Sequence, residues 1–262
     1  MTPRDRLERL RQLAHDPADE TVWAAVLAAV DGGLAQHVDY ISPHLDRWPD
    51  ALRHHIDIPG PLPIWWPLVR SLSVRGTALD TVEDVDRLLT PSAVASITHL
   101  DLSLCNLRSG DLARAAVAPL PPNLCRLDLS ANPLSGDAAA SLSTAPASFG
   151  LTEIDLAGTG LDAAEIARLA GWGALDGLRV LGIASCTLRG ANVHRVATAR
   201  GLRRLERLNA SQTTLRDDTL TALCSGRTVS GLTALDLHGN EIHGASLENL
   251  ARATGGTLKT LD

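Results

Sequence analysis

The sequence predicts an α/β fold built from repeated units, each a short strand followed by a helix. Three observations predict it. The pattern LxxLxLxxNxL occurs seven times. Its apolar positions alternate, as at Leu127 and Leu129, which indicates a strand with one buried face. Between the copies, apolar residues recur three positions apart, which is helical spacing for one buried face.

The seven copies follow one another almost evenly. They start at Val69, Ile97, Leu124, Leu151, Leu178, Leu205 and Leu232. An eighth copy, LKTLD, starts at Leu258 and is truncated at Asp262. The starts are therefore separated by a nearly constant period of about 27 residues, which is typical of repeat proteins. In such proteins, neighbouring units bury one continuous core.

Each helical segment carries two apolar columns. The first contains Leu112, Ala139, Ile166, Val193, Leu220 and Leu247. The second contains Ala115, Leu142, Leu169, Val196, Leu223 and Leu250. Because the second column lies one helical turn after the first, we expect both on the buried side of their helices.

A column of small residues follows each strand: Thr77, Cys105, Asn132, Thr159, Cys186, Thr213 and Asn240. Most of these side chains can form hydrogen bonds where the chain turns out of the strand and leaves buried backbone groups without partners. We therefore expect an internal ladder of side chains. Cys105 and Cys186 then have a structural role rather than a redox role.

This repeat, with a strand and a helix in each period, resembles the ribonuclease-inhibitor-like subfamily of leucine-rich repeats, of the bacterial, cytoplasmic type. The resemblance covers residues 69–262. It implies a right-handed horseshoe solenoid with a parallel sheet on the concave side and helices on the convex side. It does not identify a partner.

Residues 1–58 lack the repeat and predict an N-terminal helical cap over the open end of the sheet. Helices are expected to begin near Pro3 and near Asp16-Pro17, and a third stretch runs from Val38 to Trp48. Residues 59–68, rich in Pro and Trp, form a connector. His54 and His55 are interpreted as a solvated helix end rather than a metal site.

Composition limits the function. A net charge of −6 and the lack of a basic run argue against nucleic-acid binding. No segment indicates a signal peptide or a membrane span. Four cysteines without pairing motifs predict free thiols and a reducing, cytoplasmic setting. The arginine- and alanine-rich composition points to a GC-rich bacterial genome. No catalytic, cofactor or metal motif stands out.

The concave face is the candidate site for a partner protein. Its central column contains Ser73, Asp101, Asp128, Asp155, Gly182, Asn209, Asp236 and Asp262. The flanking candidates are Arg75, His99, Ser103, Arg126, Ser130, Glu153, Arg207 and His238. Around Gly182, Ala184 and Ala157 we expect a flat, nearly bare surface.

Several functional hypotheses remain open. The first is a non-catalytic interaction module or scaffold; the alternative is the recognition region of a larger enzyme or effector. A GTPase activator would need an exposed catalytic arginine, and nothing singles out Arg75. The aspartate column either contacts a basic segment of the partner or is a feature of the repeat family whatever its function.

The truncated last copy predicts an open strand edge at the C-terminal end. Two explanations fit: the chain is part of a longer protein, or a partner or a second copy of the chain covers the edge.

Overall fold

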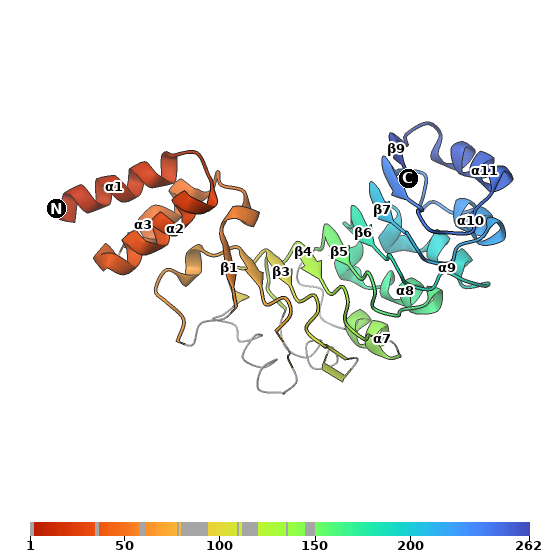
Figure 1. Ribbon diagram of the computed structural model, residues 1–262, viewed down its shortest axis with the longest axis horizontal. Helices are drawn as coiled ribbons and strands as arrows, with labels where there is room; N and C mark the ends of the chain where they lie inside the picture. The colour runs from red at the N-terminus through yellow and green to blue at the C-terminus, as the bar shows by residue number, and fades with distance from the viewer. Residues whose placement is uncertain are drawn as a thin grey trace.

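A computed structural model describes residues 3–34, 37–57, 61–77, 79, 94–108, 110–111, 120–134, 136–144 and 150–262. These residues form an α/β structure with a nine-stranded parallel sheet (Figure 1). The strands follow one another in sequence order, and the sheet does not close, because β1 and β9 are its two edges. The predicted alternation of strands and helices around a parallel sheet is confirmed.

Each copy of the sequence pattern contributes one short strand. The strands are β2 (Ser71–Ser73), β3 (His99–Asp101), β4 (Arg126–Asp128), β5 (Glu153–Asp155), β6 (Val180–Gly182), β7 (Arg207–Asn209), β8 (Ala234–Asp236) and β9 (Thr260–Leu261). Equivalent positions pair across the sheet, so that Leu127 lies between Leu100 and Ile154.

Strand β1 (His54–Ile56) was not predicted. It pairs with β2, placing His54 beside Ser71 and Ile56 beside Ser73. The interpretation of His54 and His55 as a helix end is therefore wrong. Such a short strand without the repeat's leucines gives no periodic signal, and its partner strand stabilises it.

Helices follow the strands and lie on the outer side of the curved sheet (Figure 1). They are α7 (Ala138–Ser143), α8 (Ala163–Leu169), α9 (Val193–Thr198), α10 (Asp217–Cys224) and α11 (Gly244–Thr254). Short 3₁₀ turns, η6 (Gly173–Leu175) and η7 (Arg200–Leu202), lead back towards β6 and β7.

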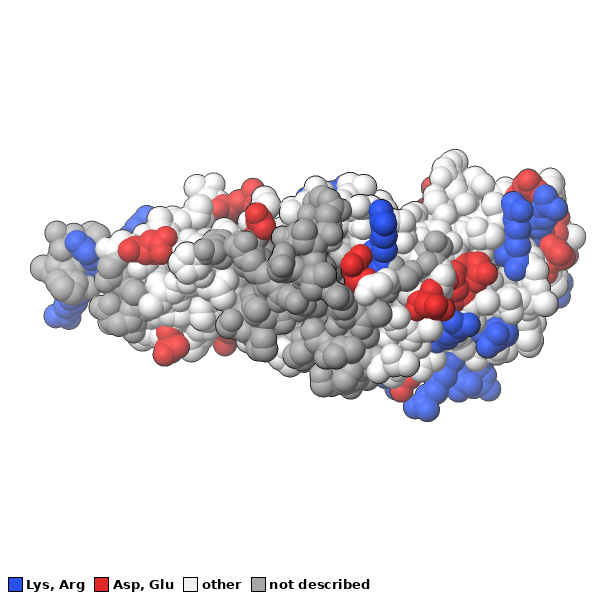
Figure 2. Space-filling model, turned by 90° about the horizontal axis from the view of Figure 1, so that it is seen from below, with Lys and Arg blue, Asp and Glu red and all other residues white. Residues whose placement is uncertain are grey.

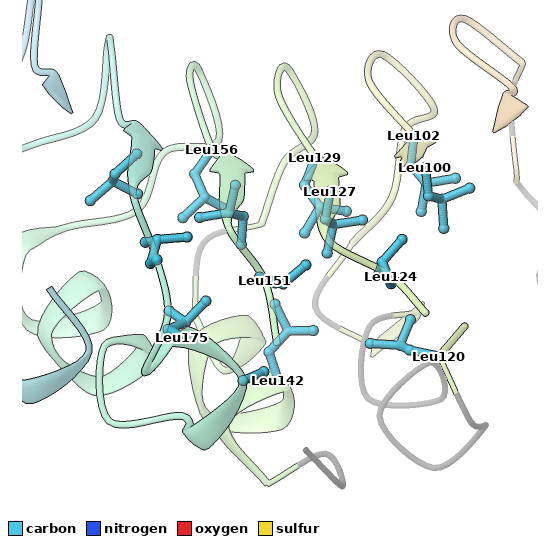
Figure 3. Close-up of a cluster of buried hydrophobic side chains, with 14 of the residues drawn as sticks. Leu100, Leu102, Leu120, Leu124, Leu127, Leu129, Leu142, Leu151, Leu156 and Leu175 are labelled. Carbon is cyan, nitrogen blue, oxygen red and sulfur yellow. The ribbon is translucent and has the colours of Figure 1, made fainter. Parts of the chain in front are cut away.

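The helix columns are buried as predicted wherever they are described, except at Leu247. That side chain is 39 % exposed, because α11 packs against α10 and no other described helix covers its far side. Leu112 and Ala115 lie outside the described residues. Leucines from the strands and helices form one continuous cluster between the two layers, and Figure 3 shows part of it.

The ladder of small side chains forms from Cys105 onwards. Asn132 is its second member, and its Oδ1 accepts the backbone amides of Cys105 and Leu107 in the preceding repeat. Thr77 is exposed and does not belong to the buried ladder, contrary to the prediction; its amide instead donates to Val74 O within its own turn. All four cysteines are free thiols, as predicted, and burial raises the pKa of Cys105 to about 11.

The N-terminal block consists of short helical elements. They are α1 (Pro3–His15), α2 (Glu20–Ala29), the π-helical η1 (Val30–Leu34), α3 (Val38–Ile41), and the 3₁₀ turns η3 (Ser42–Leu45) and η4 (Asp50–Leu52). The connector contains a further 3₁₀ turn, η5 (Trp66–Leu68). Helix α2 begins after Asp19, whose carboxylate accepts the Val22 amide, and not at Asp16-Pro17 as predicted.

Two buried side chains connect this block to the edge strand and to the connector. The indole N–H of Trp23 donates to the carbonyl of His54 on the edge strand, at 2.8 Å. Nε of Arg53 donates to Leu68 O at 2.9 Å, and burial lowers the pKa of Arg53 to about 10. The block therefore satisfies one polar backbone group that edge strand β1 leaves unpaired. None of the described helices is long and apolar enough to cross a membrane.

Candidate functional site

The candidate site is the face of the sheet opposite α7–α11, called the helix-free face below. It consists of the first and third residues of strands β2 to β8. In β4, Leu127 points into the core and is 2 % exposed, so the side chains of Arg126 and Asp128 lie on the other face. Figure 1 shows that the sheet bends with this face on the inner side.

The register brings together the predicted central column. Ser73, Asp101, Asp128, Asp155, Gly182, Asn209 and Asp236 are paired in this order. The first positions of the strands form the predicted flanking column, which includes His99, Arg126, Glu153 and Arg207. Ile56 of β1 extends the central column and is 72 % exposed. Sequence reasoning missed it because β1 was not recognised.

Each acidic residue of the central column also holds the turn that follows its strand. Oδ1 of Asp128 accepts the Ser130 amide at 2.8 Å, and Oδ1 of Asp155 accepts the Ala157 amide at 2.9 Å. Asp101, Asn209 and Asp236 make the same bond to the residue two positions further on. These Asx turns give the aspartates a structural role and fix their carboxylates in place.

The second oxygens of these carboxylates differ in their surroundings. Oδ2 of Asp101 accepts the Ser73 hydroxyl at 2.8 Å. For Oδ2 of Asp128 and Asp155, no hydrogen bond is found within the described part of the chain. These two oxygens can therefore accept hydrogen bonds from a bound molecule.

One of the flanking candidates is not on the surface of the face. Ser103 was expected on the face, but it is only 2 % exposed. Its hydroxyl donates to Asp101 Oδ1 at 2.7 Å, which draws the side chain into the turn. Ser130 is partly exposed, while Arg75 and His238 are exposed.

Gly182 does not form the bare patch that the sequence predicted, because the carboxylate of Asp155 covers it. A Cβ atom at Gly182 would lie 2.5 Å from Oδ1 of Asp155, and Gly182 is buried. Burial raises the pKa of Asp155, and the charges of Asp128 and Glu153 raise it further. The missing side chain at position 182 thus makes room for this carboxylate.

We expect Gly182→Ala to lower the free energy of unfolding by about 1 to 3 kcal/mol, because the new methyl group displaces a carboxylate that is tied to the Ala157 amide. In an Asp155→Ala background the same change should cost less than about 0.5 kcal/mol, since the clashing atoms are gone. Urea denaturation of the four proteins of this double-mutant cycle measures the coupling. If Gly182→Ala lowered the free energy of unfolding equally in both backgrounds, the contact between position 182 and the Asp155 carboxylate would be wrong.

The face is predominantly acidic. Arg126 forms an ion pair with Glu153, and no ion pair of Arg207 is found within the described residues. Burial lowers the pKa of His99, which keeps its imidazole neutral at pH 7. The negatively charged side chains that line the hollows of this face are Asp101, Asp128, Glu153, Asp155, Asp236 and Asp262. The positively charged ones are Arg126 and Arg207.

Two hollows lie on this face. One of about 380 Å³ spans β5 to β9, and its lining includes Asp155, Arg207, Asn209 and Asp236. The other, of about 240 Å³, spans β2 to β5 beside Ala51 and includes His99, Asp101 and Asp128. Glu153 and Asp155 line both hollows. The face is therefore a continuous, uneven surface.

No group of three or more His, Cys, Asp or Glu side chains that could hold a metal ion is found in the described ranges. A scan against protein-family models and a search of curated proteins found no match to this chain.

Proposed function

We propose that this chain is a leucine-rich-repeat protein that binds a partner protein, through a basic segment of that partner, on the helix-free face. The observation that carries the proposal is the row of main-chain-anchored carboxylates on an otherwise uncovered sheet face. A period of about 27 residues, with one strand and one helix in each unit, supports the repeat class.

The negative charge of the face favours a positively charged segment on the partner. Parallel strands lie ~4.8 Å apart, so neighbouring carboxylates of the column repel each other. The free Oδ2 atoms of Asp128 and Asp155 face the same surface and can accept from guanidinium or ammonium groups. A basic segment of the partner therefore relieves the repulsion and gains charge-assisted hydrogen bonds.

The rigidity of the face also favours binding. The Asx turns hold the carboxylates before the partner arrives, so that little side-chain entropy is lost when the complex forms. The role proposed here is recognition, as an interaction module or scaffold, with no catalytic step.

The test uses random peptides displayed on phage and selected on the immobilised protein. Recovered peptides should be enriched in Arg and Lys. The triple variant Asp101→Asn, Asp128→Asn, Asp155→Asn keeps the Oδ1 acceptors but removes three charges. It should bind the recovered peptides at least about tenfold more weakly, mainly through slower association, with a flatter salt dependence.

The control for this experiment removes the same charge elsewhere. Glu8→Gln, Asp39→Asn and Glu248→Gln change exposed carboxyl groups outside the helix-free face. This variant should bind within about twofold of the parent at physiological salt, where the Debye length of about 8 Å screens distant charges. If the two triple variants bind equally well, the aspartates serve only the turns, and the interface lies elsewhere.

We also propose a reducing, cytoplasmic location. All four cysteines are free, and Cys105 and Cys186 are buried in the ladder. Burial raises the pKa of both thiols, so they remain protonated and unreactive. Thiol labelling of the unfolded chain after purification without reductant should count four free thiols.

A further inference from the structure

A second charged surface lies at the edge of the sheet where the chain passes from the helices into β6 and β7. Asp176 and Gly177 follow η6, while Arg203 and Arg204 follow η7, and the two turns pack against each other. With Arg200 these residues line a hollow of about 310 Å³. Asp176 and Arg203 occupy equivalent positions in neighbouring repeats, one period apart.

Positive charge is in excess in this hollow. Three guanidinium groups line it with one carboxylate, and Nη2 of Arg200 is 3.1 Å from Oδ2 of Asp176. Across the described residues, no ion pair involves Arg203 or Arg204. Seen from below, Lys and Arg side chains form several groups over the C-terminal half of the molecule, with Asp and Glu side chains among them (Figure 2). The net positive lining of this hollow contrasts with the net charge of −6 of the whole chain.

We propose that this hollow binds the phosphate group of a phosphorylated side chain on a partner protein. Guanidinium forks match phosphate oxygens in bidentate geometry. A phosphate monoester carries nearly two negative charges at neutral pH, which matches the two unpaired arginines. A carboxylate would neutralise only one of them. Gly177 places no side chain in the hollow.

The surroundings favour a protein over a membrane or a nucleic acid. Asp176 lines the hollow, and Glu206, paired with Arg179, lies at the same edge just before β7. A long polyanion would meet these carboxylates as well as the arginines. None of the exposed large apolar residues in the described part of the chain lines the hollow, so it offers no anchor for a lipid surface. This inference does not depend on the helix-free face.

The experiment measures fluorescence anisotropy of a labelled pool of phosphoserine peptides with randomised flanks. The probe should bind the parent protein, and the same pool without phosphate should bind at least tenfold more weakly. Inorganic phosphate should displace it. Arg203→Gln with Arg204→Gln should weaken binding at least tenfold. The control pair Arg9→Gln and Arg11→Gln, exposed on α1, removes equal charge and should weaken it less than twofold.

Circular dichroism should give the same melting temperature for both variants, since all four arginines are exposed. If both arginine variants lost the same peptide affinity, net charge alone would explain the loss, and the proposed site would be wrong. Equal binding of phosphorylated and unphosphorylated peptides would also overturn the proposal. Tighter binding of single-stranded RNA, or of phosphatidylcholine vesicles containing phosphatidylinositol phosphates, with the same loss in the hollow variant, would overturn the assignment to a protein partner.

Discussion

Asn132→Ala is expected to lower the free energy of unfolding by about 3 to 5 kcal/mol, because the side chain is 1 % exposed and satisfies several buried backbone groups. Its Oδ1 accepts the amides of Cys105 and Leu107, both at 3.0 Å. Its Nδ2 donates to Leu102 O at 2.8 Å and to Leu129 O at 2.9 Å. Alanine would leave these four backbone groups buried without partners, at about 1 to 3 kcal/mol each before relaxation.

Asn240 provides a matched control in the same protein. It makes the corresponding four bonds, to the amides of Thr213 and Leu215 and the carbonyls of Ala210 and Leu237. Asn240 is partly exposed, so water can reach the groups that alanine would free. In urea denaturation, Asn240→Ala should therefore lower the free energy of unfolding by less than half as much as Asn132→Ala. Equal losses would mean that burial of the asparagine does not determine how much its hydrogen bonds stabilise the fold.

The second large effect is expected for Leu127→Ala, which should cost about 2 to 5 kcal/mol. Leu127 lies in the middle of β4 and packs within the leucine cluster of Figure 3. Removing most of its side chain gives up apolar burial and leaves a cavity that a close-packed core fills only in part.

Leu247→Ala makes the same chemical change at a position that is 39 % exposed. It should cost about 1 kcal/mol or less, because less apolar surface is lost from the interior. Urea denaturation monitored by circular dichroism compares the two variants. A neutral Leu127→Ala would mean that the middle positions of the strands do not form the core.

The role of the aspartates illustrates what could be predicted about the candidate site. The spacing of the repeat placed Asp101, Asp128 and Asp155 in one column, and the strand register agrees. The hydrogen bond from each carboxylate to the amide two positions further on was not predicted. Periodicity shows which residues are neighbours in the sheet. It does not show which groups form hydrogen bonds with the backbone amides in the turn that follows each strand.

The repeat pattern alone was enough to predict the strands β2 to β9 and most of the buried columns, while their parallel order was expected from the resemblance to leucine-rich repeats. It could do so because a repeat presents the same apolar pattern many times, and any other register would expose every leucine at once. It also indicated the ladder that Asn132 and Asn240 occupy, since each copy must satisfy the same backbone groups.

Other features depend on one particular pair of neighbours and emerge only in the folded chain. Strand β1 exists because β2 offers it a pairing edge, and the Trp23 indole satisfies its outer side. Asp155 covers Gly182 because a single missing Cβ leaves room there. The arginine hollow forms because η6 and η7 bring Asp176 and Arg203 together. A repeat pattern describes only what equivalent positions have in common. How each side chain packs depends on the particular residue beside it, which the pattern does not specify.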